Sequence, residues 1–158
     1  MDELNTPPEA IEPLMWYLLN SPSLNNTGYP PVIWEPSPGN HYLTEYMVKK
    51  HDLKVIETSG NYFDTPFPQA ATVLVTNPPF SKKIHYLAKA REEAKPFALL
   101  LPITTLGVRR AHPSLEDLQI IFLKRRIDFT GKKRPWFTVA WFTWGLKLGS
   151  QLVFPRRR

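Results

Sequence analysis

The sequence contains no cysteine, so disulfide bonds and thiolate metal sites are excluded. It has no apolar run long enough to span a membrane, and its acidic N-terminus is unlike a secretory signal peptide. We therefore expect a cytoplasmic protein that does not bind membranes. The histidines are too far apart for a local zinc motif, so we expect no metal site; they are His41, His51, His85 and His112.

The composition is that of a basic globular protein. With 42% hydrophobic and 22% charged residues, we expect residues 1–158 to form one domain. The net charge of +6 suits a polyanionic partner such as nucleic acid. Half of this excess comes from Arg156, Arg157 and Arg158 in a basic tail over residues 155–158, and such tails often serve only solubility. The charge is therefore modest support for a nucleic-acid partner.

The most informative stretch runs from Val73 to Ser81 (VLVTNPPFS). Its apolar, β-branched first half predicts a strand buried on both faces. The two prolines lack N–H donors and lead the chain out of the sheet, after which Ser81 is expected to cap a helix. Asn77 and Phe80 should thus lie at the carboxyl end of a parallel strand, where open α/β sheets bind ligands. The alternative is a stiff turn in which Asn77 bonds only to local backbone.

Asn77-Pro78-Pro79-Phe80 resembles the catalytic motif of S-adenosylmethionine-dependent amino methyltransferases, above all the adenine-N6 DNA methyltransferases. The resemblance implies S-adenosylmethionine as the cofactor, DNA as the substrate, and these four residues as the catalytic set. In that family the Asn77 side-chain oxygen and the Pro78 carbonyl accept hydrogen bonds from the target amino group. Phe80 stacks on a base flipped out of the duplex. Catalysis would then be mainly orientation, without a tuned general base.

A helix is predicted to begin at Thr6-Pro7-Pro8-Glu9, with Thr6 as its cap and Pro7 in its first turn. Its apolar face consists of Ile11, Leu14, Met15, Leu18 and Leu19. A Thr-Pro-Pro segment before such a helix resembles the N-terminal segment that closes over the cofactor in small phage-type adenine methyltransferases. The resemblance makes residues 1–20 a cofactor-closing segment, adds Thr6 and Pro7 to the cofactor contacts, and would place a phage protein in the host cytoplasm.

Val32-Ile33-Trp34 predicts a short buried strand, followed by a loop and by a helix over about 41–51. A glycine in such a loop lets the backbone approach a ligand closely. The loop resembles the family's cofactor motif, so Glu35, Pro36 and Gly39 are candidate contacts. Asn40-His41 stands where a second glycine is usual, and Asn40 is the residue we expect to tolerate a left-handed backbone.

The next predicted strand, residues 53–57, ends in an acidic residue. In nucleotide-binding α/β folds such a residue binds ribose hydroxyls, which makes Glu57 a candidate. The segment that follows resembles the one that contacts the cofactor's adenine, through Phe63 and either Asn61 or Asp64. Residues 65–70 are too few and too rich in proline for another strand and helix, so we expect a sheet trimmed in its middle.

Three further strands are predicted over residues 97–102, 118–123 and 137–144, the last two forming an antiparallel pair. The fold class is thus α/β: a single Rossmann-like class I methyltransferase sheet, mostly parallel with a C-terminal antiparallel pair. The chain leaves no room for a separate target-recognition domain. Specificity would then come from a protein partner, or the protein would act as a homodimer.

Basic residues around the last strands are candidates for phosphate contacts, and an aromatic residue beside them could stack on an unpaired base. The alternative for each basic residue is a solvated surface charge. For the aromatic residue it is a position in the core or at the edge of the sheet. The candidate nucleic-acid contacts are Arg109, Arg110, Lys124, Arg125, Arg126, Lys132, Lys133, Arg134 and Trp136.

Two other functions stay open. Asn-Pro-Pro-aromatic motifs also occur in methyltransferases of ribosomal RNA guanine, tRNA adenine and protein glutamine, because each target presents a planar nitrogen. A catalytically degenerate nucleic-acid-binding module on the same fold is favoured by Asn40-His41 and by the trimmed middle. The intact motif at residues 77–80 argues against that module.

Overall fold

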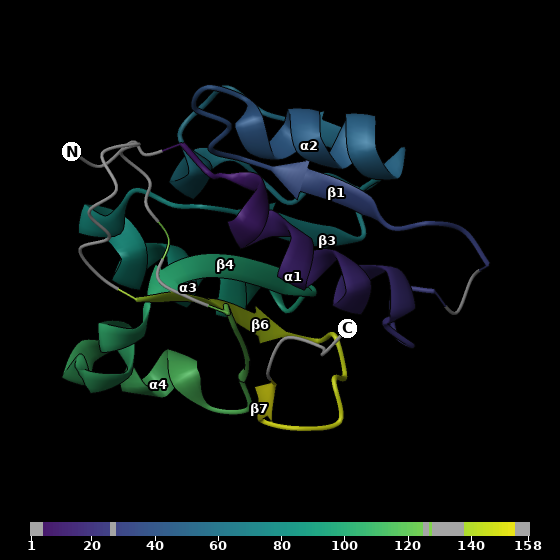
Figure 1. The fold of residues 1–158 in the computed structure, drawn as a ribbon. Coiled ribbons are helices and arrows are strands. Elements are labelled where there is room, and N and C mark those ends of the chain that lie inside the picture. The colour runs from purple at the N-terminus through teal and green to yellow at the C-terminus, as the bar shows by residue number, and fades with distance from the viewer. Residues whose placement is uncertain (1–4, 26–27, 125–126, 128–137, 154–158) are drawn as a thin grey trace.

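A computed structural model describes residues 5–25, 28–124, 127 and 138–153. At its centre is a seven-stranded sheet of order β2-β1-β3-β4-β6-β5-β7 (Figure 1). Strand β6 is antiparallel to its neighbours β4 and β5, and all other neighbours pair in parallel. The strands are β1 Val32–Glu35, β2 Lys54–Glu57, β3 Val73–Thr76, β4 Phe97–Pro102, β5 Gln119–Phe122, β6 Val139–Trp144 and β7 Leu152–Val153.

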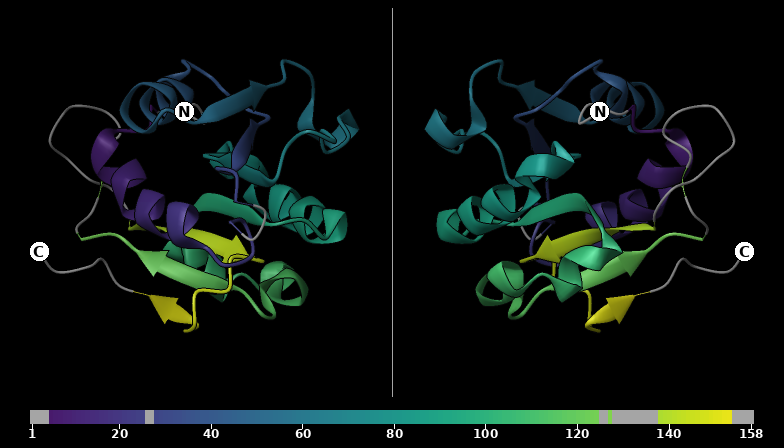
Figure 2. Two further views of the ribbon diagram at one scale, coloured as in Figure 1. Left: turned by 90° about the vertical axis from the view of Figure 1, so that its right-hand side faces the viewer. Right: turned by 90° about the vertical axis from the view of Figure 1, so that its left-hand side faces the viewer.

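Helices cover both faces of the sheet (Figure 2). Two α-helices pack on one face, α1 Pro8–Asn20 and α2 Tyr42–His51. On the other face lie α3 Lys83–Glu93 and the short α4 His112–Leu115. Among the described residues, the connections also contain four 3-10 helices: η1 Tyr62–Asp64, η2 Phe80–Lys82, η3 Ile103–Gly107 and η4 Arg109–Ala111. None of the described helices is long and apolar enough to cross a membrane.

The central strands supply both hydrophobic layers. In β3, Val73 and Val75 pack toward α1 and α2, whereas Leu74 packs toward α3, and all three side chains are fully buried. Every residue of β4 is buried as well. This burial on both faces explains why β3 and β4 read as continuous apolar runs rather than as alternating patterns.

The N-terminal helix is fastened to the C-terminal part of the sheet. The Trp141 indole N–H on β6 donates to the Ala10 carbonyl at 2.7 Å. At the other end of α1, the Ser21 hydroxyl donates to the Leu146 carbonyl at 2.7 Å. The first helix therefore occupies a fixed place beside the sheet, and it carries the residues before it to the sheet's carboxyl edge.

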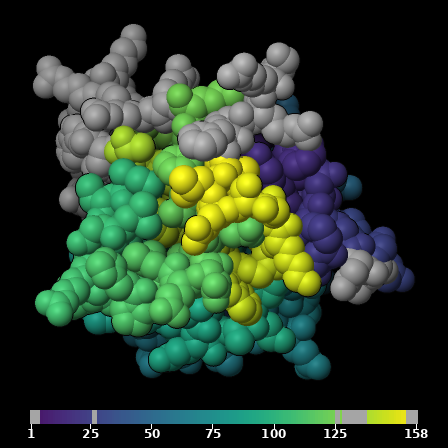
Figure 3. All heavy atoms as spheres, turned by 90° about the horizontal axis from the view of Figure 1, so that it is seen from below, coloured from purple at the N-terminus to yellow at the C-terminus, as the bar shows by residue number. Residues whose placement is uncertain are grey.

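The predicted fold class is confirmed, including the antiparallel pair β5–β6 and the trimmed middle, since only η1 and loop residues separate β2 from β3. Strand β7 was not predicted, because two residues carry no recognisable pattern. It pairs with β5 at the edge of the sheet, near α4 on the surface shown in Figure 3.

Both predicted helix caps are wrong. Helix α1 begins at Pro8, which takes the first-turn position and leaves Pro7 as the N-cap, so Thr6 is free for another role. Ser81 lies inside η2, and α3 begins at Lys83 after Lys82. The tight turn after the two prolines delays that helix beyond the serine.

Gly145, just after β6, lies close against Pro96 in a left-handed backbone conformation. Its φ is +79°, and an added Cβ would lie 3.1 Å from Pro96 Cα. Gly145→Ala is therefore expected to lower the free energy of unfolding by about 2–4 kcal/mol in urea titrations. Gly149→Ala is the matched control, because its φ is +86° but nothing lies within 4 Å of the added Cβ. Equal losses in the two variants would show that packing against Pro96 is unimportant.

Candidate functional site

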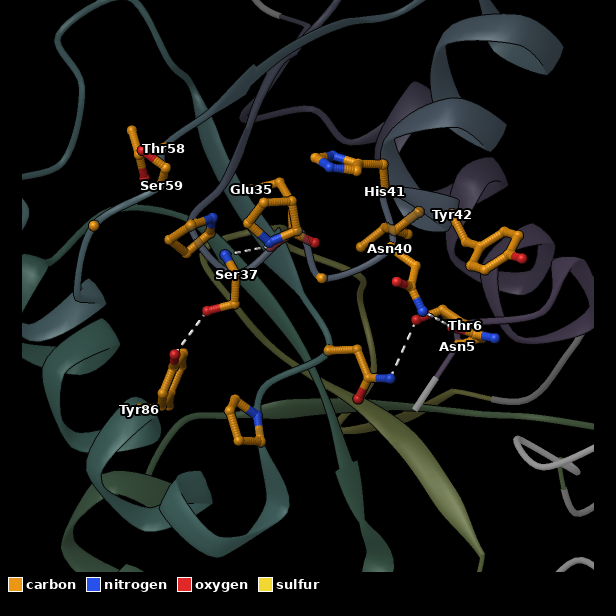
Figure 4. A pocket seen from close by; sticks show the side chains of 17 residues that line it. Asn5, Thr6, Glu35, Ser37, Asn40, His41, Tyr42, Thr58, Ser59 and Tyr86 are labelled. Atoms are coloured by element: carbon orange, nitrogen blue, oxygen red, sulfur yellow. Dashed lines mark hydrogen bonds between the residues drawn. The ribbon is translucent and has the colours of Figure 1, made fainter. Parts of the chain in front are cut away.

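A cavity of about 460 Å³ lies at the carboxyl ends of β1, β2 and β3 (Figure 4). Its walls come from the N-terminal segment, the loop after β1, the start of α2, the residues after β2 and β3, and α3. Six predicted site residues line it: Thr6, Glu35, Pro36, Gly39, Asn77 and Pro79. Segments up to about 80 residues apart in sequence thus meet at one edge of the sheet, as the position of the Asn-Pro-Pro-Phe motif predicted.

Asn77 presents an unused acceptor. Its amide nitrogen donates to the Thr6 hydroxyl at 3.1 Å. Its oxygen Oδ1 is buried and has no hydrogen-bond partner among the described residues. A buried acceptor without a partner costs about 1–3 kcal/mol, and native proteins rarely leave one without a reason. The arrangement therefore suits a ligand that donates a hydrogen bond to this oxygen.

Glu35 places a buried carboxyl group in the wall of the same cavity. It is 2% exposed, and it accepts hydrogen bonds from the Ser37 amide at 2.8 Å and from the Thr76 hydroxyl. Burial raises the pKa of Glu35 to about 8, although both hydrogen bonds act to lower it. The group is therefore mostly protonated at neutral pH, and a cation bound beside it would favour its ionised form.

No protein-family model matches the chain, and no curated protein matches its sequence. A similar solved structure is that of a dimethyladenosine transferase from Plasmodium falciparum, with a TM-score of 0.53 and 12% sequence identity. The match covers 89% of this chain and 62% of that chain. The fold is that of a class I methyltransferase. At this identity the likeness establishes the fold alone, and the chain spans less than two thirds of the neighbour's length.

Within the methyltransferase fold, the loop after β1 differs from the prediction in one backbone position. His41, rather than Asn40, adopts the left-handed conformation, with φ of 66°. Asn40 instead donates through its side chain to Asn5 Oδ1 at 2.6 Å, which ties the N-terminal segment to this loop (Figure 4). The intrinsic tolerance of asparagine for this conformation favoured Asn40, and the bond of Asn40 to Asn5 is a contact that the local sequence does not encode.

Glu57 lies outside the residues that line the cavity. Its carboxylate is held by His41 Nδ1, at 2.8 and 2.9 Å from the two oxygens, and by the Thr44 hydroxyl at 2.7 Å. The cavity wall beyond β2 is formed by Thr58 and Ser59 instead. The carboxylate predicted to bind ribose is therefore bonded to residues at the start of α2. On this side of the cavity, the hydroxyl groups of Thr58 and Ser59 are the ones that could bind a ribose instead.

The adenine-contact candidates after β2 also lie outside the lining. Asn61 caps η1 by accepting from the Phe63 amide at 3.0 Å, and Asp64 is exposed. The ring of Phe63 packs against Tyr86 at 5.1 Å between centroids. Pro7, Pro78 and Phe80 are absent from the lining too. Pro78 is buried, and Phe80 is partly buried against the hydrophobic cluster that includes α1 and α2.

Tyr86 on α3 is a lining residue that the sequence did not single out. Its hydroxyl shares a hydrogen bond of 2.6 Å with the Ser37 hydroxyl. Burial raises the pKa of Tyr86, so the phenol stays protonated and available for hydrogen bonding. An aromatic residue at helical spacing resembles any core residue, and only the approach of the β1 loop distinguishes it.

Three candidate nucleic-acid contacts are described and exposed. Arg109 and Arg110 form η4 after β4, and Lys124 follows β5. Since β6 is antiparallel to both strands, β4 and β5 run in the same direction, so all three side chains follow carboxyl ends. The remaining candidates lie outside the described residues, as does the basic tail: Arg125, Arg126, Lys132, Lys133, Arg134 and Trp136. In the described part of the chain, no cluster of His, Asp and Glu could hold a metal ion.

Proposed function

We propose that the chain is an S-adenosylmethionine-dependent methyltransferase that acts on an exocyclic amino nitrogen, with adenine N6 in DNA as the preferred target. The observation that carries this proposal is the buried, unpartnered Asn77 oxygen at the cavity. An amino group donates hydrogen bonds and would satisfy it. The structural neighbour is named for dimethyladenosine, and adenosine carries a single exocyclic amino group. The choice of DNA rests on the resemblance of the Thr-Pro-Pro segment and its helix, and of the aromatic last strand at residues 140–144, to phage-type adenine methyltransferases.

The residues of the cavity fit S-adenosylmethionine. A volume of about 460 Å³ falls within the range of about 300–1,000 Å³ typical of small-molecule sites. The Glu35 carboxyl can pair with a cationic group, and Gly39 leaves open space beside the backbone. Thr58 and Ser59 offer hydroxyl groups on the far wall. When bound, S-adenosylmethionine supplies a methyl group activated by a positively charged sulfur.

The protein's own contribution is orientation. Asn77 Oδ1 would accept one N–H of the target amino group, and the Pro78 carbonyl, held rigid by the following proline, would accept the other. Both contacts direct the nitrogen lone pair toward the cavity and reduce its delocalisation into the ring. Holding reactants in line in this way can account for a large part of a rate enhancement without a general base.

Purified protein is expected to bind S-adenosylmethionine and to transfer its methyl group to DNA. At a cofactor concentration a hundred times the Kd, binding should stabilise the fold by about 2.7 kcal/mol, visible as a rise in Tm. Radiolabelled cofactor offered with DNA, RNA and protein pools in parallel then identifies the substrate class. A folded sample that shows neither calorimetric heat nor a thermal shift at millimolar cofactor would contradict the proposal.

A catalytically inactive nucleic-acid-binding module is the second candidate. It is favoured by the engagement of Glu57 with His41 and Thr44, away from the cavity. Such a module would bind DNA or RNA through the exposed basic residues Arg109, Arg110 and Lys124, without cofactor binding. Nucleic-acid binding in a sample that ignores S-adenosylmethionine would support it, with affinity falling steeply as salt is raised.

A further inference from the structure

We propose that Thr6 is a positioning residue that holds the Asn77 amide with its oxygen facing the substrate. The inference rests on the proposed function and deepens it, because it names a second side chain on which transfer would depend. It starts from two observations on one amide group: its nitrogen is bonded to Thr6, and its oxygen is bonded to nothing described.

An asparagine amide is nearly symmetric in shape but not in chemistry. Its oxygen accepts hydrogen bonds and its nitrogen donates them. A target amino group is a donor, so only the oxygen can bind it productively. If the amide were flipped by 180°, its N–H groups would face the N–H groups of the target, and two donors cannot form a hydrogen bond. Something must therefore engage the nitrogen end and keep the oxygen end toward the target.

Thr6 is placed to do this. Its side chain is 7% exposed, and it has no part in capping α1. Its hydroxyl oxygen accepts the hydrogen bond from Asn77 Nδ2 at 3.1 Å. No other hydrogen bond to the Asn77 side chain occurs in the described part of the chain. In the structure this contact engages the nitrogen end of the amide and leaves its oxygen end without a partner.

The neighbours of Thr6 hold it in place from both directions. On the N-terminal side, Asn5 is bonded to Asn40 in the loop after β1 (Figure 4). On the C-terminal side, α1 is bonded to β6 through Ala10 and Trp141. The short segment of residues 5–7 is therefore a strap beside the cavity, fixed at both ends, with Thr6 in contact with Asn77.

The test uses the full-length chain with Thr6→Val, which removes the hydroxyl at nearly constant shape, and Thr6→Ser, which keeps it. With cofactor and substrate both saturating, Thr6→Val is expected to lower kcat roughly tenfold, and Thr6→Ser about twofold or less. Thr72→Val is the matched control. Its hydroxyl bonds to Val32 at the opposite end of β3, so kcat should not change.

A second readout does not depend on activity. The side-chain NH2 resonances of Asn77, identified by their loss in Asn77→Asp, should shift and exchange faster with water in Thr6→Val. They should stay near their original positions in Thr6→Ser. Because this measurement needs no substrate, it tests the contact even if the proposed function fails.

Three results would overturn the inference. One is an unchanged Asn77 signal in Thr6→Val, and another is equal behaviour of the valine and serine variants. The third is recovery of the full rate at saturating cofactor, which would mean that Thr6 acts on cofactor affinity and not on Asn77. If the wild-type chain neither binds S-adenosylmethionine nor transfers methyl groups, the proposed function fails and the NH2 resonances alone decide whether Thr6 orients Asn77.

Discussion

Asn77→Ala is expected to lower methyl transfer by at least about a hundredfold, the usual effect of losing one oriented hydrogen bond that strengthens in a transition state. Cofactor affinity should change little, because the proposed mechanism assigns this oxygen to the target amino group and not to the cofactor. Stability should also change little, because removing a buried acceptor that has no partner offsets the loss of the hydrogen bond from Asn77 Nδ2 to Thr6. The measurement is the transfer rate and the Tm of the same preparation.

Asn25→Ala provides the opposite control. The Asn25 side chain donates to the carbonyls of Leu19 and Ser21 at 2.9 Å, in a loop outside the cavity. Its loss should lower stability by about 1–2 kcal/mol and leave transfer intact. If Asn77→Ala instead melts early and keeps its rate, Asn77 serves only the turn after β3, and the assignment of the site is wrong.

Glu35 is expected to make the fold less stable as the pH rises. In the unfolded chain its pKa is near 4.5, and in the folded protein it is about 8. Between these values the folded state keeps a proton that the unfolded state has lost, so the free energy of unfolding falls with pH and levels off above pH 8. The difference between the two pKa values corresponds to about 3–5 kcal/mol.

Glu35→Gln should remove this dependence, because the amide oxygen can still accept from Ser37 and Thr76 but does not ionise. Urea titrations of both proteins between pH 5 and pH 9 isolate the effect as the difference between their two slopes. Parallel curves would mean that Glu35 ionises in the folded state as easily as in water. The same logic predicts that a bound cation releases the Glu35 proton near neutral pH.

Local composition was sufficient to predict most of the sheet and the centre of the site. The apolar run before Asn77 and the two prolines after it place that residue at a strand end whatever the rest of the chain does. The loop glycine was found in the same way, whereas Glu35 followed from the resemblance of that loop to the family's cofactor motif. These features depend on near neighbours in sequence, for which strand and turn preferences are strong.

The rest depended on contacts between distant segments. Thr6 was expected to cap a helix. Because the helix begins at Pro8, Thr6 is not its cap and instead accepts a hydrogen bond from Asn77. Glu57 was expected in the cavity, and the approach of α2 engaged it with His41. The spacing of Tyr86 is that of a core residue, and its role at the cavity depends on the hydrogen bond between its hydroxyl and Ser37 in the loop after β1. No local sequence pattern predicts these tertiary contacts.

The bond between Trp141 and Ala10 joins residues 131 positions apart. During synthesis the first helix leaves the ribosome long before the strand that anchors it. Contacts of such long range form late, because the intervening chain must be ordered first. The strap that carries Thr6 therefore has no fixed place until β6 has emerged. We expect a nascent chain that ends before β6 to lack a complete cavity, so the protein acquires its site only after β6 has emerged.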